Sequence, residues 1–360
     1  MNAKKRSNLC KNKRFSYNIK MNLLYTCIFD NFDYLKLLEL LLVSGVVFSD
    51  FRGNHFDFLI ITTHKFETKI NEIFNKYDLN VKIKCIQIEN IYSALSARFH
   101  IFDFVNKEYS KFLYIDTDIL ITKNLSILFN LSLENKIYTL QEGTISDDHH
   151  GKEIFDFSKI NPQTPGFTSG IILFNNCVEI KNLFNTINNN IEINIKQNGI
   201  KPSAYDQAFL NYYSIISGRY NSSLLKNYTI NNPNEFNYNY VLCHFPGGVG
   251  NFSNKFEKMS SYFLYLYDSY NFKIINNNNC FLKKKYNWKH DMKNVSGFLE
   301  FNDNNELITP WGNGTYEILN GNYVKAFWYK DCHLLIFNDN FKKFISIRRM
   351  DNNLSLGEAI

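Results

Sequence analysis

The residues best suited to chemistry are two aspartates that interrupt an apolar run. Asp116 and Asp118 lie in KFLYIDTDILITKN, residues 111–124, between an apolar segment that ends at Ile115 and another that begins at Ile119. In a strand, residues i and i+2 point to the same face, so the two carboxylates can converge on one ligand. Buried carboxylates need a positive partner, and Mg²⁺ or Mn²⁺ binds carboxylate oxygens while keeping positions open for phosphates. The pattern favours a metal–phosphate site over two surface acids in a turn.

A histidine and a glycine-rich turn form a second candidate. In YVLCHFPGGVGNFSNK, residues 240–255, a short apolar run leads to His244 and then to Gly247, Gly248 and Gly250. Exposed backbone amides beside an imidazole suit a phosphate and its metal ion. A single histidine at a strand end is commonly structural, so the functional interpretation depends on the glycines and on the two aspartates upstream.

Two other polar groups have weaker claims. The run DDHH at residues 147–150 lies in the polar segment 143–166, and consecutive residues of regular structure cannot all face one ion. We therefore interpret this segment as a mobile loop. Asp206 and Gln207 open the predicted helix DQAFLNYY, where the helix dipole favours an acid whatever its function.

The elements that must position these residues alternate between strand and helix patterns. Apolar runs predict strands at 22–29, 56–62, 81–88 and 112–115, the last run resuming at 119–121 after the two aspartates, and helical periodicity covers 34–43, 65–77 and 93–105. Gly45 is expected to end the first helix. The alternation predicts an α/β fold with a mainly parallel sheet and helices on both faces. Ligands of such sheets lie beyond the carboxyl ends of the strands, so the Asp30–Asn31 loop and the two aspartates can face one crevice.

The second half of the chain continues the pattern and then changes character. Phe167–Asn175 reads as a strand in which Gly170 permits a close approach, and 180–195 reads as a helix. After residue 288 the chain consists of short alternating runs separated by Asn, Asp and Gly, which predicts a small antiparallel β module. Its aromatic residues are expected to form a core, with a carbohydrate-binding surface as the alternative. They include Trp311, Tyr316 and Trp328.

These patterns divide the chain into four parts. We expect a basic disordered leader at 1–20, a catalytic domain at 21–275, an Asn/Lys-rich linker at 276–288 and the small β module at 289–360. A hydrophobic content of 45% supports a sizeable core, and the net charge of +6 lies mainly in basic runs at the leader and linker. Solvated basic tails are a commoner reading of such runs than nucleic-acid binding.

The seven cysteines and the N-terminus bear on the compartment. The cysteines are scattered without a C-x-x-C pair, which argues against a disulfide framework and a structural zinc site. The basic start is not followed by an apolar signal-peptide core, and the run at 35–48 is too short and polar to span a membrane. We therefore expect a cytoplasmic protein without a transmembrane segment.

Taken in order, these elements resemble glycosyltransferase family 8, a GT-A group that includes glycogenin and bacterial lipopolysaccharide galactosyltransferases. The resemblance covers roughly residues 21 to 260. The matching positions are Asn31 and Tyr34 after the first strand, Arg98 before the strand that leads to the two aspartates, the Asp-x-Asp at Asp116 and Asp118, Thr168-Ser169-Gly170, Asp206-Gln207, and His244 with Gly247. Two positions depart from the family. Thr168 replaces an asparagine, and Gly250 stands where a lysine is expected, the nearest lysine downstream being Lys255.

The resemblance implies a retaining, UDP-sugar-dependent transferase with a GT-A fold and a divalent metal, Mn²⁺ or Mg²⁺. Its partners would be a nucleotide sugar and a carbohydrate, protein or lipid-linked glycan acceptor, and not nucleic acid. The implied metal ligands are Asp116, Asp118 and His244. The implied donor contacts are Asp30, Asn31, Tyr34, Arg98, Asp116, Gly247, Gly248, Gly250 and, in place of the missing lysine, Lys255. Asp206 and Gln207 would face the sugar, and together with Arg98 they are the candidate catalytic residues.

Two alternatives remain open. A nucleotidyltransferase also uses acids, a metal and a nucleotide, but it usually carries a Gly-rich basic loop after the first strand, and the loop here is IFDNFDY. The other alternative is a catalytically inactive domain whose C-terminal β module binds carbohydrate. The missing motif lysine favours that reading, whereas the joint presence of Asp116, Asp118 and His244 opposes it.

Overall fold

The computed structural model describes residues 21–49, 51, 55–77, 79–105, 109–196, 202–233, 239–247, 252–269, 285–289, 294–318, 323–337, 341–348 and 354–360. The expected leader, the expected linker up to residue 284, and Gly248 and Gly250 of the glycine-rich turn lie outside the described residues.

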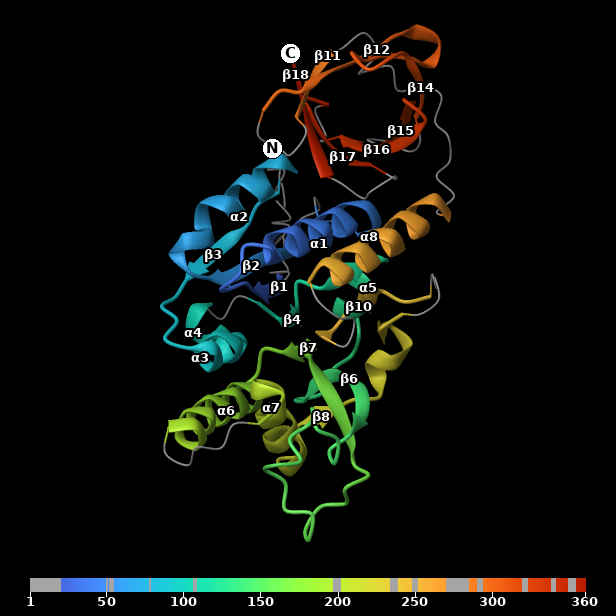
Figure 1. Cartoon of the computed structure of the whole chain (residues 1–360). Coiled ribbons are helices and arrows are strands. Elements are labelled where there is room, and N and C mark those ends of the chain that lie inside the picture. Colours follow the sequence, from blue (N-terminus) through green and yellow to red (C-terminus); the bar gives the residue numbers. More distant parts are fainter. Residues whose placement is uncertain are drawn as a thin grey trace, which may run out of the picture.

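A seven-stranded mixed sheet forms the centre of the large domain (Figure 1), with the strand order β3-β2-β1-β4-β7-β6-β8. Its parallel part consists of β1 (Asn22–Cys27), β2 (Phe56–Thr62), β3 (Lys82–Cys85) and β4 (Lys111–Ile115). β7 (Pro165–Asn175) runs antiparallel to both β4 and β6 (Ile137–Thr144), and β8 (Tyr220–Asn221) is parallel to β6. The GT-A-type α/β architecture expected from the sequence is confirmed.

Helices cover both faces of this sheet because the strand residues alternate between two apolar cores. Leu24 and Leu113 belong to the core shared with α1 (Tyr34–Phe48), α2 (His64–Lys76) and α8 (Phe252–Ser269). Tyr25 and Phe112 belong to the opposite core. That second core is covered by α3 (Ile91–Ser96), the 3₁₀ turn η1 (Ala97–His100), α4 (Ile101–Phe104), α6 (Val178–Lys196) and α7 (Tyr205–Ile216).

One helix prediction was wrong in detail. α1 does not end at Gly45 but continues to Phe48, and the missing Cβ of Gly45 makes room for the Phe51 ring; a Cβ there would lie 2.5 Å from Phe51 Cζ. The segment 93–105 is helical up to Phe104, as the succession of α3, η1 and α4. No helix in the described part of the chain is long and apolar enough to cross a membrane.

The chain leaves the central sheet at the two aspartates. After β4 it turns at residues 116–118, and β5 (Ile119–Ile121) joins a separate three-stranded sheet. There β5 pairs antiparallel with β10 (Leu242–His244), and β10 pairs parallel with β9 (Thr229–Asn231). The strand expected to end at the two aspartates does end there, and a turn between two sheets brings the carboxylates together. Two short helical segments, α5 (Ser126–Phe129) and η2 (Leu224–Asn227), complete this part.

The C-terminal module is a closed antiparallel barrel of eight strands. They are β11 (Lys285–Lys289), β12 (Gly297–Phe301), β13 (Glu306–Ile308), β14 (Gly314–Ile318), β15 (Tyr323–Trp328), β16 (Asp331–Phe337), β17 (Lys343–Arg348) and β18 (Leu354–Ala359), with the one-turn segment η6 (Asp303–Asn305) between β12 and β13. β11 starts inside the segment expected to be linker, where the lysine run obscures the inward pair Tyr286 and Trp288. Tyr316 and Trp328 are buried core residues, whereas Trp311 is 39% exposed.

The barrel rests on the helices of the large domain (Figure 1). Its outward-facing residues Leu334, Ile336 and Ile347 are buried in the same core as α1, α2 and α8. The Tyr323 hydroxyl donates a 3.0 Å hydrogen bond to the Val46 carbonyl near the end of α1. The two parts therefore share one continuous apolar interface.

Candidate active site

The structure brings together the three expected metal ligands. The donor atoms of Asp116, Asp118 and His244 all lie within 4.8 Å of one another. Asp116 and Asp118 come from the turn after β4, and His244 is the last residue of β10, which pairs with β5 immediately after that turn. Two carboxylates and an imidazole form a donor set that suits Mn²⁺ or Mg²⁺.

The His244 ring is oriented as a metal ligand requires. Its Nδ1 lies 2.7 Å from Asn231 Oδ1 on the neighbouring strand β9, so Nδ1 carries the proton and donates it. In the neutral ring, Nε2 is then an acceptor, and it lies 3.4 Å from Asp118 Oδ1. That carboxylate oxygen is buried without a hydrogen-bond partner among the described residues. Two acceptor atoms facing each other are the arrangement that a shared cation stabilises. Sequence reasoning missed Asn231, whose position depends on the pairing of β9 with β10.

Gly170 on β7 makes room for this cluster. A Cβ at this position would lie 2.6 Å from His244 Cε1, 2.8 Å from His244 Nε2 and 3.0 Å from Asp116 Oδ2. No side chain fits there without displacing two of the ligands. The close approach expected at Gly170 is thus an approach to the metal cluster.

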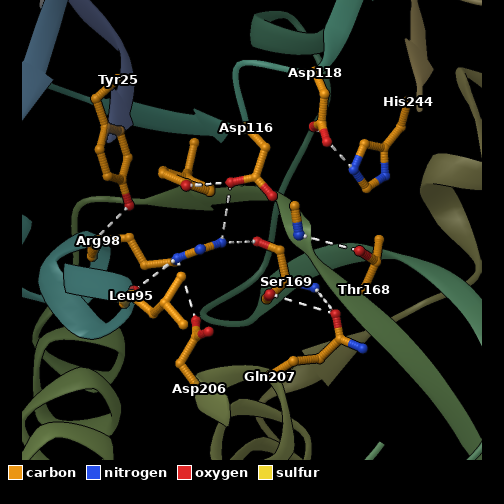
Figure 2. Close-up of polar contacts among 12 residues, drawn as sticks. Tyr25, Leu95, Arg98, Asp116, Asp118, Thr168, Ser169, Asp206, Gln207 and His244 are labelled. Atoms are coloured by element: carbon orange, nitrogen blue, oxygen red, sulfur yellow. Dashed lines mark hydrogen bonds and ion pairs between the residues drawn. The ribbon is translucent and has the colours of Figure 1, made fainter. Parts of the chain in front are cut away.

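Arg98 is the centre of a buried polar network (Figure 2). Its Nη1 donates a 2.7 Å hydrogen bond to the Ser169 carbonyl and lies 3.4 Å from Asp116 Oδ1. Its Nε donates to the Leu95 carbonyl and lies 3.3 Å from Asp206 Oδ2. The guanidinium also stacks on the Tyr114 ring at 4.4 Å. Arg98 therefore holds Asp116 and Asp206 in place on opposite sides of one planar group.

Tyr114 is a further residue that sequence reasoning assigned only to the strand. Its hydroxyl donates a hydrogen bond to Asp116 Oδ1, the oxygen that also faces Arg98. Asp116 Oδ2 is left to face Gly170 and His244. The signal was its spacing, because Tyr114 and Asp116 are two residues apart at the end of β4.

The two residues that open α7 enter the network by different routes. Burial raises the pKa of the Asp206 carboxyl to about 6, although the nearby Arg98 guanidinium lowers it. Gln207 accepts a 2.9 Å hydrogen bond from the Ser169 amide and donates a 2.7 Å bond to the His149 carbonyl. Gln207 thus connects β7 to the loop 143–166, which the sequence predicted to be mobile and which packs here against α7.

Lys255 pairs directly with Asp118, one of the three expected metal ligands. Its Nζ, reaching from the first turns of α8, lies 2.5 Å from Asp118 Oδ2, and both side chains are nearly buried. Burial raises the pKa of Asp118, but a protonated His244 ring and the Lys255 ammonium outweigh burial and lower that pKa to about 2. Asp118 is therefore ionised at neutral pH.

A pocket of about 1060 Å³ opens beside the cluster. The expected site residues that line it are Asp30, Tyr34, Arg98, Asp116, Asp118 and Lys255. Its other walls come from residues after β1, β2 and β3, in agreement with the predicted crevice at the carboxyl ends of the strands. The remaining expected residues with a described position do not line it: Asn31, Asp206, Gln207, His244 and Gly247.

A second trio of metal-binding residue types lies at the wall of the same pocket. His64 Nδ1 is 3.2 Å from Glu67 Oε2, and the Cys85 thiol donates to that same oxygen at 3.5 Å. In the described part of the chain, this trio and the Asp116 cluster are the two groups of three or more such residues that are close enough to share one ion. The hydrogen bonds within the trio account for its geometry without a metal.

One family model matches more than half of the chain. The model of the family described as glycosyl transferase family 8 matches residues 54–252. No curated protein matches the chain in sequence.

Among solved structures, the WbbM bifunctional glycosyltransferase in its apo form is 14% identical, with a TM-score of 0.48 over 69% of this chain and 52% of that chain. This chain thus spans about half of the WbbM chain. Mouse xyloside xylosyltransferase 1 is 12% identical, with a TM-score of 0.48 over 64% of this chain and 99% of that chain. The galactosyltransferase LgtC, in complex with donor and acceptor sugar analogues, is 12% identical, with a TM-score of 0.47 over 68% of this chain and 95% of that chain.

Proposed function

The chain belongs to glycosyltransferase family 8, and from this premise we propose that it moves a sugar from a UDP-sugar to a glycan acceptor with retention of configuration. The proposal includes a divalent cation, Mn²⁺ or Mg²⁺, held by Asp116, Asp118 and His244. The observation that carries it is the meeting of these three side chains, with an unpartnered Asp118 oxygen, beside a pocket that Asp116 and Asp118 line and that is large enough for a nucleotide sugar.

The charges of the site also fit a cation. Arg98 and Lys255 face the three carboxylates of Asp116, Asp118 and Asp206, which leaves one negative charge uncompensated at neutral pH. When bound, a divalent ion supplies Lewis-acid stabilisation of the departing diphosphate. It would turn this surplus of negative charge into a surplus of positive charge beside the donor.

Different residues of the pocket would bind the two parts of the donor, the nucleoside at one end and the diphosphate at the other. Tyr34, 41% exposed, and Asp30 line the end formed by the loop after β1, where a base and a ribose would bind. Arg98 and Lys255 line the same pocket near the metal cluster, where the diphosphate would lie. Arg98 acts there mainly by holding Asp116 in position, since its guanidinium is already bonded on both sides.

Asp206 and Gln207 are proposed to lie on the sugar side. Neither lines the empty pocket, but both contact the segment Ser169-Gly170 or Arg98 that borders the metal cluster. Their role in this proposal is to orient β7 and Arg98 around the reacting sugar.

A donor screen tests the proposal. The protein is incubated with Mn²⁺ and a panel of UDP-, GDP- and CMP-sugars, and release of free nucleotide is followed with and without EDTA. We expect EDTA-sensitive release of UDP from one sugar. The variant Asp118→Asn should abolish this release while keeping the unfolding temperature, and Asp103→Asn, a surface carboxylate on α4, is the matched control that should retain it.

A cobalt spectrum assigns the metal to the right cluster. Co²⁺ held by Asp116, Asp118 and His244 has no sulfur ligand, so no sulfur-to-metal charge-transfer absorption should appear. A band that disappears in Cys85→Ser would move the metal to the trio of His64, Glu67 and Cys85 and contradict the assignment.

The inactive-domain alternative is disfavoured by the barrel. Two of the three aromatic residues considered for a carbohydrate-binding surface, Tyr316 and Trp328, fill the barrel core. Absence of nucleotide release from every donor, together with absence of metal-dependent UDP binding, would revive that alternative.

A further inference from the structure

The ammonium of Lys255 lies in the metal cluster itself. Nζ is 2.5 Å from Asp118 Oδ2, while Asp118 Oδ1 faces His244 Nε2 at 3.4 Å. The side chains of Lys255 and Asp118 are 11% and 12% exposed, so solvent screens their attraction only weakly. Both oxygens of Asp118 are thus directed toward positions that a cation can fill.

The lysine is anchored at its backbone and adjustable at its tip. α8 is fixed in the core by Met259, Phe263 and Leu266, which are nearly inaccessible to solvent. The lysine side chain has a flexible stem of four carbons, so the ammonium can move by several ångströms while the helix stays in place. The structure therefore allows the charge to change partners without a change of fold.

An ammonium and a divalent ion cannot both be bound strongly by this carboxylate. Two cations within a few ångströms repel each other, and in a partly buried site that repulsion is poorly screened. A metal ion on Asp118 would weaken the hold on Lys255, whose nearest new anion in the same pocket would be the diphosphate of the donor.

We propose that Lys255 competes with the divalent cation for Asp118 and, once displaced, pairs with the donor diphosphate. The inference rests on the proposed function, since the diphosphate is the group that receives the ammonium. It assigns Lys255 a role in ordered loading, in which metal binding releases the cation that then attracts the nucleotide. The lysine works from α8, five residues after Gly250, the position that holds a lysine in the family pattern.

Metal titration of the full chain without nucleotide tests the competition. Calorimetry or the electron paramagnetic resonance of free Mn²⁺ should show that Lys255→Met binds Mn²⁺ more tightly, by roughly 5- to 150-fold, the usual range for two coupled ligands. Lys255→Arg keeps the charge and should not tighten binding. At saturating Mn²⁺, Lys255→Met should bind UDP more weakly than the wild type.

A second buried ion pair provides the matched control. Lys76 Nζ lies 3.2 Å from Glu39 Oε1, with side chains 16% and 7% exposed, and the two residues come from α2 and α1. Lys76→Met removes a comparable cation and should leave the Mn²⁺ affinity unchanged. A general effect of net charge would instead change both variants alike.

Chemical labelling of the wild-type chain tests the displacement without any variant. Amine acylation followed by mass spectrometry should show Lys255 protected in EDTA, more reactive with Mn²⁺, and protected again with Mn²⁺ and UDP. Because this measurement uses the native protein, it stays informative if Lys255→Met fails to fold.

The outcomes separate this inference from the proposed function. Suppose the wild type binds Mn²⁺ through Asp118, Lys255→Met binds it no more tightly, and the labelling of Lys255 does not change with Mn²⁺. The proposed competition is then rejected, and the proposed function stands. If the wild type binds neither Mn²⁺ nor UDP, the proposed function fails and the competition fails with it.

Discussion

At the scale of single residues, the site depends on one position that lacks a side chain. Gly170 faces both His244 and Asp116, and a Cβ at this position would collide with both side chains. Two hydrogen bonds then set the orientation of these side chains: His244 Nδ1 donates to Asn231 Oδ1, and the Tyr114 hydroxyl donates to Asp116. Such supporting contacts commonly change metal affinity as strongly as the ligands do.

Gly170→Ala should weaken Mn²⁺ binding by about 10- to 100-fold, because the new methyl group displaces His244 and Asp116 from their common position. Titration calorimetry measures the effect. Gly166→Ala, on the same strand β7, is the control, since its Cβ would lie 2.7 Å from the ring of His150, outside the metal cluster. It should lower stability yet leave Mn²⁺ affinity largely intact, and equal losses of affinity would reject the steric explanation.

The cluster of Asp116, Asp118 and His244 could be predicted from the sequence because the residue types and their order are informative. Two acids interrupt one apolar run, and a histidine ends another beside several glycines. The pairing of Lys255 with Asp118 could not be predicted from the sequence, since the two residues are 137 positions apart and meet only through the packing of α8. The role of Asn231 was equally hidden, because it depends on which strand lies beside β10.

At the scale of elements, the site lies where the chain changes from one sheet to another. β4 belongs to the central sheet and β5 to the small sheet with β10, so the turn at residues 116–118 is held from both sides. The strand and helix alternation was visible in the sequence as apolar periodicity. This change of sheet was not, because the apolar residues on the two sides of the aspartates look the same whether they join one sheet or two.

The ion pair of Asp57 and Lys82, on strands β2 and β3, should make stability depend on pH. Asp57 on β2 accepts hydrogen bonds from Lys82 Nζ at 2.8 Å and from the Tyr109 hydroxyl. Burial raises the pKa of Asp57, but these two donors outweigh it, so its pKa lies below the ordinary value of 3.8. A lowered pKa in the folded state means that the stabilisation is present above pH 3.8 and is lost as the pH falls through the folded-state pKa.

Asp57→Asn should therefore reduce the free energy of unfolding at pH 7 by less than about 1 kcal/mol, since Lys82 is largely exposed, and by progressively less in acid. Urea unfolding of both proteins across this pH range measures the difference. In a Lys82→Met background the same substitution should have a smaller effect, and an unchanged effect there would show that the pair is not its source.

At the scale of the whole molecule, the barrel is a structural partner of the transferase domain and contributes no described residue to the wall of the pocket. Its strands β16, β17 and β18 present apolar residues outward, where a free barrel would present polar ones. Alternating runs predicted most of the strands, but the docking surface was not predictable, because an outward leucine and an inward leucine follow the same pattern.

Leu334→Ala should destabilise the protein by about 2–4 kcal/mol, as expected for a leucine removed from a closed core, although Leu334 lies outside the barrel. Thermal unfolding measures this loss, and Leu335→Ala, inside the barrel, gives the comparison. Well below the unfolding temperature, donor turnover by Leu334→Ala should match the wild type. A change in stability below about 0.5 kcal/mol, typical of surface positions, would mean that the barrel is merely tethered.

The pairing of β5 with β10 also sets an order of events during synthesis. Each barrel strand pairs with its neighbour in sequence, apart from the closure of β11 with β18, and such local pairing forms quickly. The metal cluster is the opposite case, because Asp118 waits for a histidine and a lysine that are made more than a hundred residues later. A nascent chain that has completed its first four strands already holds Arg98 and Tyr114 beside Asp116, but Asp118 still lacks its partners. The complete cluster forms only after α8 has emerged, so a donor site built on it would be assembled late.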